Sequence, residues 1–211
     1  MGLKCSIGEV ANRIQASELQ NKGVLANCHV NVLQTQDHPQ FKTYGEELKW
    51  LTTDPTRMTW VAKTIQDIAT SGNTLILVDR ISAGEILEKK IKDAVFVSGS
   101  TKNTDRKEQY DEVSTSQNKI IIATYGVAAV GINIPRIFNL VLIEPGKSFV
   151  RVIQSIGRGI RKAEDKDSVQ IWDITSSCKF AKRHLGARKK FYKEANYPYN
   201  IEKINYENPY T

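Results

Sequence analysis

The residues best suited to act on a charged ligand lie between positions 154 and 161 of the 211-residue chain. If this stretch is helical, Gln154, Arg158 and Arg161 project from roughly one side, because residues three and four apart are neighbours on a helix surface. Phe149 and Ile153 begin a separate apolar stripe suited to packing on a sheet. A guanidinium group binds phosphate oxygens through its planar fork and stabilises charge on a transferring phosphoryl group. The spacing therefore predicts a polar helix edge that contacts phosphate.

A solvated, basic helix end is the alternative for the same stretch, since Lys162 and Lys166 extend its positive charge. Gly157 and Gly159 weigh against this alternative. Each glycine costs a helix about 1 kcal/mol relative to alanine, and a helix that only contacts water gains nothing in return. We expect the two glycines to let the backbone approach another group closely.

The elements that must position these arginines alternate along the chain. Apolar runs predict strands at residues 75–78, 94–97, 120–123, 140–143 and 169–172. The segments between and before them predict helices at residues 54–69, 82–91, 104–114 and 148–160. Continuous apolar strands separated by helices are typical of an α/β fold, in which helices cover both faces of a parallel sheet.

Polar residues directly follow two of these strands. These strand-end positions hold Ser98, Gly99, Thr124 and Gly126. In a parallel sheet ligands meet the carboxyl ends of the strands, and a hydroxyl before a short helix with free N–H groups suits a phosphate. Arg106 could support the Ser98–Gly99 loop or contact a phosphate itself. Ordinary strand-to-helix caps are the alternative for each position, but together the positions favour binding of a nucleic-acid backbone.

Three stretches of the chain resemble motifs of superfamily 2 helicases. Residues 154–161 resemble the Q-x-x-G-R-x-x-R motif that closes the second RecA-like domain of these motors. Residues 123–135 resemble the T-x-x-x-x-x-x-G-x-[DN]-x-P segment, and Ser98-Gly99 with Arg106 is similar to an earlier phosphate-contacting turn. The three motifs follow in the order of the family within residues 74–174. The resemblance implies a RecA-like parallel sheet with helices on both faces.

In that family the matching positions act on a nucleotide that the first RecA-like domain holds. The resemblance implies that Arg158 and Arg161 are arginine fingers, and that Gln154 contacts the phosphates and couples the site to strand binding. It also implies that Gly131 and Asn133 lie near the nucleotide. The implied cofactors are ATP and Mg²⁺, held mainly by the first domain. Asn133 replaces a frequent aspartate, which leaves its detailed role open.

The family also binds nucleic acid on the surface of this domain. The positions that match its backbone-contacting motifs are Ser98, Gly99, Arg106, Thr124, Tyr125 and Gly126. Such contacts carry no base code, so the predicted binding follows backbone geometry and weakens with salt. The implied partners are duplex or branched DNA and the first RecA-like domain of the same protein. The implied activity is that of an ATP-dependent helicase or translocase, with branch migration or unwinding of branched DNA in recombination and repair.

A complete ATPase site is missing from the sequence. Residues 126–131 have the glycine spacing of a Walker A loop, yet Ile132 and Asn133 stand where lysine and Ser or Thr are required. Leu75 to Asp79 imitates a Walker B strand without a following glutamate. This chain alone is therefore predicted to be inactive as an ATPase. The alternative function is a stand-alone, non-catalytic nucleic-acid-binding module whose arginines only anchor phosphates.

The two ends of the chain differ from its alternating middle. By the family resemblance, residues 1–36 finish the first RecA-like domain and cross to the second, which we place at residues 37–195. The basic segment at residues 178–193 predicts either a phosphate-binding helix or a solvated helix whose aromatic side chains pack inward. Residues 196–211 predict a tail docked on the surface, with base stacking by its tyrosines as the alternative.

Composition narrows the class of partner. The formal net charge of +7 favours an anionic partner, nucleic acid before membrane, because no basic amphipathic helix with bulky aromatics is evident. The cysteines are odd in number and widely separated, which predicts free thiols in a reducing compartment. The histidines are equally scattered and predict no metal site. We expect a cytoplasmic protein, since no signal peptide or apolar run of membrane length occurs.

Overall fold

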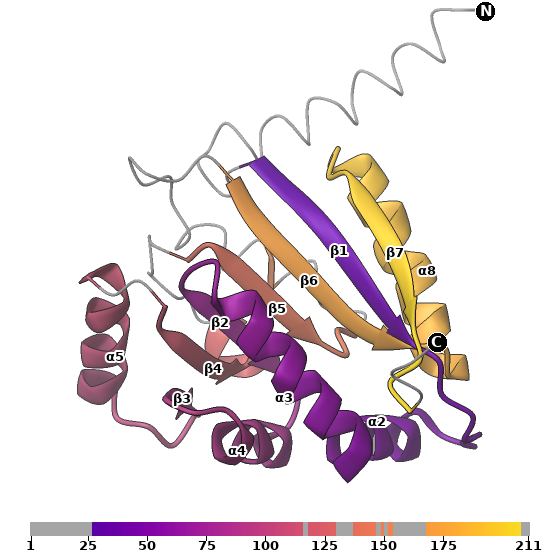
Figure 1. Ribbon diagram of the computed structural model, residues 1–211, viewed down its shortest axis with the longest axis horizontal. Coiled ribbons are helices and arrows are strands. Elements are labelled where there is room, and N and C mark those ends of the chain that lie inside the picture. Colours follow the sequence, from indigo (N-terminus) through magenta and orange to yellow (C-terminus); the bar gives the residue numbers. More distant parts are fainter. Residues whose placement is uncertain are drawn as a thin grey trace, which may run out of the picture.

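The computed structural model describes residues 27–115, 118–129, 137–146, 149, 152–153 and 168–207. These residues form a seven-stranded sheet in the order β3-β4-β2-β5-β6-β1-β7, and every neighbouring pair is parallel (Figure 1). The strands are β1 (Asn27–Thr35), β2 (Thr74–Val78), β3 (Ala94–Val97), β4 (Ile120–Thr124), β5 (Asn139–Ile143), β6 (Ser168–Ser176) and β7 (Tyr199–Ile204). The described helices are α2 (Tyr44–Thr53), α3 (Pro55–Ala69), α4 (Ile81–Lys90), α5 (Asn103–Thr115), α6 (Tyr125–Ala129) and α8 (Lys179–Glu194). This arrangement confirms the predicted α/β class.

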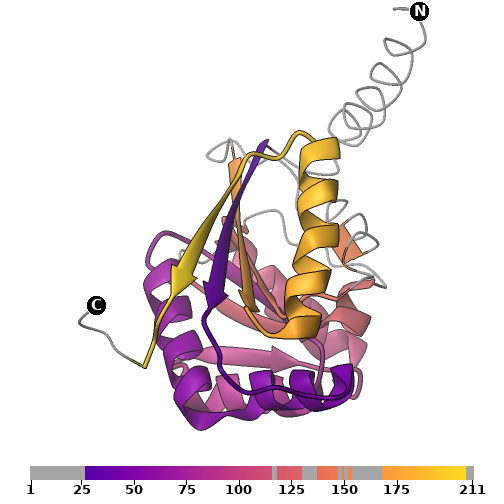
Figure 2. The same cartoon turned by 90° about the vertical axis from the view of Figure 1, so that its right-hand side faces the viewer.

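Helices cover both faces of the sheet because the central strands are apolar on both sides. Along β2, Leu75 and Leu77 belong to one buried cluster, whereas Ile76 belongs to another, as the two-residue repeat of a strand requires. The cluster with Ile76 contains residues of α3 and α4, and the cluster with Leu75 contains residues of α5, α6 and α8. Figure 2 shows α3 and α8 on opposite sides of the strands.

Local sequence signals explain where α3 begins and ends. The Asp54 carboxylate accepts a hydrogen bond from the backbone N–H of Arg57 at 3.0 Å, and Pro55 occupies the first turn. Both features are favoured at a helix start. The helix ends at Ala69, where the sequence predicted its end. Gly72 has a φ of 152°, and an added Cβ would lie 2.9 Å from the Phe138 side chain, so this turn requires glycine.

Both ends of the described chain contribute strands to the sheet. Residues 27–35, assigned to an interdomain crossing, form β1 between β6 and β7. Residues 199–204, assigned to a surface tail, form the edge strand β7, which pairs with β1. The sheet therefore extends across the boundaries placed at residues 36 and 196, and the division into domains stays a prediction. Pairing with β1 satisfies the backbone groups along one edge of β6.

Two absences hold within the described part of the chain. None of the described helices is long and apolar enough to cross a membrane. Among the same residues, no group of three or more His, Cys, Asp or Glu side chains is placed to hold a metal ion. Cys28 and Cys178 are both buried.

Candidate nucleic-acid interface

The predicted finger and nucleotide positions lie outside the residues that the structure describes. These positions are Gly131, Asn133, Gln154, Arg158 and Arg161. In the helix predicted at residues 148–160, the described residues Phe149, Val152 and Ile153 are helical and buried. The burial of Phe149 and Ile153 confirms the beginning of the predicted apolar stripe. The roles of the arginines stay predictions.

The loop that follows β3 is held by Arg106 from α5. The Nη2 atom of Arg106 donates to the carbonyl oxygens of Ser98 at 2.8 Å and Gly99 at 2.9 Å. The Ser98 side chain is buried, and its hydroxyl oxygen lies 2.8 Å from that of Ser100. By contrast, a Cβ added at Gly99 would meet nothing within 4 Å, so open space surrounds that backbone. Of the two roles predicted for Arg106, the structure shows support of the loop.

Thr124 ends β4 and caps the helix that follows. Its hydroxyl oxygen accepts a hydrogen bond from the backbone N–H of Val127 at 3.2 Å. The capping alternative is thereby confirmed, although the hydroxyl proton can still be donated to a phosphate. Gly126 is exposed in the first turn of α6. Because α6 begins directly after β4, the Walker-like glycine spacing starts in a helix and not in a phosphate-binding loop.

Tyr125 points into the domain. Its hydroxyl donates to the carbonyl oxygen of Ile143 at 3.0 Å, and burial raises its pKa well above the ordinary value, with the Asp173 charge adding to the effect. The hydroxyl group is thus already bonded within the domain, and the predicted contact between Tyr125 and a DNA backbone stays a prediction. The sequence did not reveal this because the partner carbonyl lies at the end of a different strand, β5.

The basic helix α8 divides its cations between an exposed face and a buried ion pair. Arg188 is buried and makes paired bonds to Asp173, from Nε at 2.7 Å and from Nη2 at 2.9 Å. Tyr192 also donates to this carboxylate at 2.8 Å. The exposed cations on α8 are Lys179, Lys182, Arg183, Lys190 and Lys193. Inward packing of the aromatic side chains is confirmed, and Arg188 is a structural residue.

The first turn of α8 is already bound by a carboxylate. Glu47 of α2 accepts hydrogen bonds from the backbone N–H groups of Phe180 at 3.0 Å and Ala181 at 2.7 Å. Two of the free N–H groups that would suit a phosphate are thus satisfied inside the protein. This contact also fixes α2 against α8.

A second buried ion pair lies at the carboxyl ends of β5, β6 and β1. The Nη2 atom of Arg57 donates to Glu144 at 2.5 Å, and its Nε donates to the Thr35 hydroxyl at 3.2 Å. The residue Glu144 has a φ of 44°, an unusual value for a residue with a side chain. Burial raises the pKa of Glu144 to about 7, while the Arg57 charge acts in the opposite direction. Arg57 and Glu144 bind each other, so we assign them a structural role.

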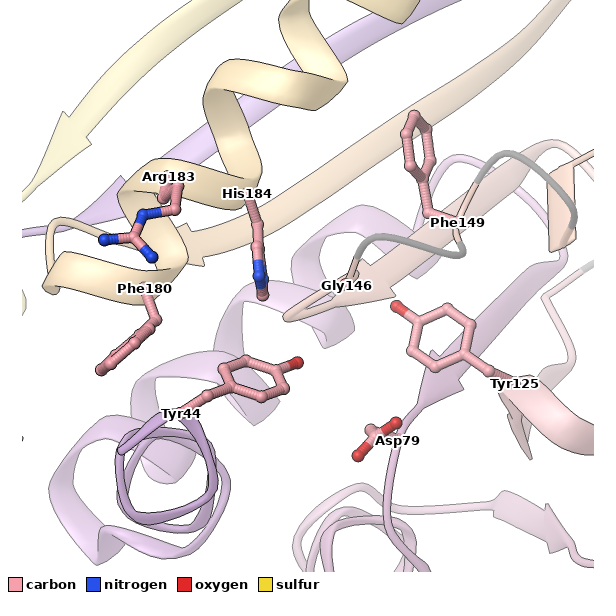
Figure 3. Close-up of a pocket in the computed structure, with 8 residues that line it drawn as sticks. All are labelled: Tyr44, Asp79, Tyr125, Gly146, Phe149, Phe180, Arg183 and His184. Atoms are coloured by element: carbon pink, nitrogen blue, oxygen red, sulfur yellow. The ribbon is translucent and has the colours of Figure 1, made fainter. Parts of the chain in front are cut away.

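A pocket of about 500 Å³ opens beside this ion pair. Its lining comprises Tyr44, Asp79, Tyr125, Gly146, Phe149, Phe180, Arg183 and His184, and we call it the aromatic pocket (Figure 3). The lining residues come from α2, α6 and α8, from the segments that follow β2 and β5, and from the helical residue Phe149. Tyr44 and Tyr125 face one another across the opening, with Asp79 beside them (Figure 3). Burial raises the pKa of Tyr44, and the nearby Asp79 charge raises it further.

Sequence reasoning missed this pocket because it predicted no helix in the segment directly before residue 54. A usable signal was present, since Thr43 and Glu46 have the spacing of a helix-capping pair. In the structure the Thr43 hydroxyl accepts a hydrogen bond from the backbone N–H of Glu46 at 3.3 Å. The helix that begins there places Tyr44 next to α8.

The fold and the carboxyl-edge site define the class of protein: a RecA-like motor domain of the second, C-terminal kind. The chain matches the helicase conserved C-terminal domain over residues 57–163 and belongs to that family. It is 28% identical to the ATP-dependent DNA helicase UvsW of Enterobacteria phage T4 over 195 residues, which is 87% of this chain and 39% of the relative. The chain thus spans about two-fifths of the length of that protein.

Solved structures show the same fold. The crystal structure of T4 UvsW matches with a TM-score of 0.73 at 24% identity, covering 85% of this chain and 42% of that chain. The E. coli DEAD-box protein SrmB matches with a TM-score of 0.59 at 16% identity, covering 88% of this chain and 96% of that chain. These likenesses confirm the RecA-like arrangement that the sequence resemblance implied.

Proposed function

We propose that this chain is the C-terminal motor domain of an ATP-dependent DNA helicase or translocase of superfamily 2. In the complete protein it would couple ATP hydrolysis to movement on duplex or branched DNA, including branch migration or unwinding. The similarity to UvsW, whose name describes an ATP-dependent DNA helicase, supports this proposal. The membership of the helicase C-terminal family supports it independently of that single relative.

The observation that carries the proposal is the arrangement at the ends of β3 and β4. These neighbouring strands end in the Ser98–Gly99 loop, which Arg106 holds from behind, and in Thr124, which starts α6. The open backbone at Gly99 and the hydroxyl of Thr124 would contact successive phosphates of one strand. Arg106 would act through the loop and not through a phosphate.

ATP and Mg²⁺ would be held mainly by a first RecA-like domain. The direct start of α6 after β4, without an intervening phosphate-binding loop, supports this division. Arg158 and Arg161 would reach the nucleotide from this domain after closure, while Gln154 would link the site to DNA binding. Bound ATP supplies the phosphoryl group whose developing charge such arginines stabilise.

A stand-alone nucleic-acid-binding module is the second candidate, favoured by the exposed cations along α8. A reconstitution experiment distinguishes the two. ATP hydrolysis is measured for this chain alone and for the chain fused to a first RecA-like domain encoded upstream, with and without branched DNA. The motor proposal predicts DNA-stimulated hydrolysis only in the fused protein. Hydrolysis that is absent from the fusion, while the chain alone still binds DNA, would favour the binding module.

A further inference from the structure

We propose that the aromatic pocket binds an unpaired nucleobase of the DNA strand whose phosphates follow the ends of β3 and β4. This inference rests on the proposed function and adds a base-binding site to it. The strand order places β2 directly beside β4, so Asp79 at the end of β2 follows Thr124 along the same edge. A strand that passes Gly99 and Thr124 therefore reaches the pocket next.

The pocket offers an aromatic surface that is already held in place. Tyr44 is 36% exposed, a high value for an aromatic side chain. His184 meets the Tyr44 ring edge-on with ring centres 4.8 Å apart, and Phe180 lies 6.3 Å from it. A Cβ at Gly146 would approach the Tyr44 hydroxyl to 3.3 Å, so the neighbouring backbone packs closely against this residue. A ring fixed in this way can stack on a base with little further loss of conformational freedom.

The charges around the pocket favour a base inside it and a phosphate outside it. Asp79 is exposed and lines the opening, where a carboxylate repels phosphate but accepts hydrogen bonds from the exocyclic amine of a base. Arg183 and Lys179 lie on the other side, 5.6 Å and 5.5 Å from the centre of the Phe180 ring. These exposed cations can hold the phosphate that leads to the inserted base.

A free phosphate or similar anion fits the pocket less well than a base does. Arg188, a buried arginine whose charge acts on the lining residue Tyr44, is already paired with Asp173. The N–H groups of Phe180 and Ala181 are bound to Glu47. The volume of about 500 Å³ lies in the range of small-ligand sites, and a single base with its sugar is a ligand of this class.

Binding of intact and abasic single strands tests the proposal. The dissociation constant of this chain is measured by fluorescence anisotropy for a short DNA strand and for the same strand with abasic positions. Loss of one stacked base should weaken binding roughly ten-fold. Tyr44→Leu should weaken binding of the intact strand by the same factor and leave the abasic strand unchanged, whereas Tyr44→Phe should retain the preference. The matched control is Trp60→Leu, a change of another partly exposed aromatic residue that lies on α3.

Asp79 gives the proposal a second, chemical readout. Cytosine, adenine and guanine carry an exocyclic amine, whereas thymine does not. A strand that contains only cytosine should therefore bind with an affinity a few-fold higher than a strand that contains only thymine. Asp79→Ala should remove this difference, because no carboxylate remains to accept from the amine. Equal affinity for both pyrimidines in the unaltered chain would contradict the predicted role of Asp79.

Photocross-linking tests the same proposal without any variant, so a substitution that prevents folding cannot affect the result. A strand containing 5-iodouracil is irradiated with the unaltered chain, and the cross-linked peptide is identified by mass spectrometry. Cross-links to Tyr44, Phe180 or His184 are expected. Equal binding of intact and abasic strands, with cross-links only to residues outside the aromatic pocket, would contradict base binding in the pocket. That result would leave the proposed binding of the DNA backbone unaffected. No binding of either strand at low salt would overturn both.

Discussion

Two halves of the same sheet edge use polar residues in opposite ways. At the ends of β5, β6 and β1, which we call the ionic half, Glu144 and Asp173 are buried with arginine partners. At the ends of β3 and β4, which we call the hydroxyl half, Thr124 and the Gly99 backbone remain accessible. This difference shows that a charged side chain at the carboxyl edge of this sheet is not by itself evidence of a ligand site. In the ionic half the buried ion pairs hold the fold, whereas the neutral groups of the hydroxyl half remain accessible.

The cause of the difference lies in the elements that cover each half. The ionic half is closed by α2 and α8, which Glu47 joins, and burial there would destabilise any charge without a partner. The hydroxyl half is bordered by the short helix α6 and by a loop that Arg106 holds. The aromatic pocket lies where the two halves meet. It combines rings packed as in the ionic half with the open surface of the hydroxyl half.

Breaking the ionic half should have the largest effect. Arg188→Met leaves the Asp173 carboxylate buried without its guanidinium partner, which should lower the free energy of unfolding by about 3–5 kcal/mol. Urea unfolding followed by circular dichroism measures the change. Lys190→Met is the matched control on the exposed face of α8 and should stay within about 0.5 kcal/mol of the original. The triple variant that adds Asp173→Leu and Tyr192→Phe should recover part of the loss.

The protonation of Glu144 should have a smaller effect, which is seen when the free energy of unfolding is measured as a function of pH. The pKa of Glu144 is about 7 in the folded state and near 4.5 when unfolded. Between these values the folded chain keeps a proton that the unfolded chain has lost, so this group makes stability fall as pH rises from 4.5 to 7. The slope approaches about 1.4 kcal/mol per pH unit for one group and sums to roughly 3 kcal/mol. Glu144→Gln should remove that slope, and an unchanged slope would show that Glu144 remains ionised across this range.

The smallest expected effect belongs to the hydroxyl half. Thr124→Val removes the oxygen that accepts from the Val127 N–H and should cost about 1 kcal/mol of unfolding free energy. Thr124→Ser keeps the hydroxyl and should cost less. If Thr124 also contacts a phosphate, Thr124→Val should weaken DNA binding equally for all sequences, as titrations with several oligonucleotides would show. A sequence-dependent loss would contradict a backbone contact.

The sequence predicted the elements whose signals are local. Asp54 and Pro55 indicate the start of α3. The continuous apolar runs of β2 and β5 are recognisable because both faces of these strands are buried. The edge strand β7 was missed because most of its side chains are exposed, so it lacks an apolar pattern. It is a strand because β1 offers it backbone partners. The pairing partner lies about 170 residues earlier in the chain, so no local pattern around β7 could reveal the strand.

The candidate site was predictable in part for the same reason. Thr124 stands in a recognisable strand-to-helix turn, and its cap was among the predicted alternatives. The fate of Arg188 depends on Asp173, which a different element brings to it. The burial of one arginine within a run of basic residues could therefore not be read from residues 178–193. The pocket residue Tyr44 was missed with α2, although its capping residues could have revealed the helix.

The central claim is that Arg158 and Arg161 complete an ATPase site on another domain. The most direct measurement is DNA-stimulated ATP hydrolysis by this chain fused to its first RecA-like domain, in the Arg158→Ala and Arg161→Ala variants. Lys162→Ala, which removes a neighbouring positive charge, is the matched control. The account predicts that either arginine change lowers hydrolysis at least 10³-fold while DNA affinity is retained, and that the lysine change has little effect. Hydrolysis indifferent to both arginines, or loss of DNA affinity without loss of hydrolysis, would contradict the claim.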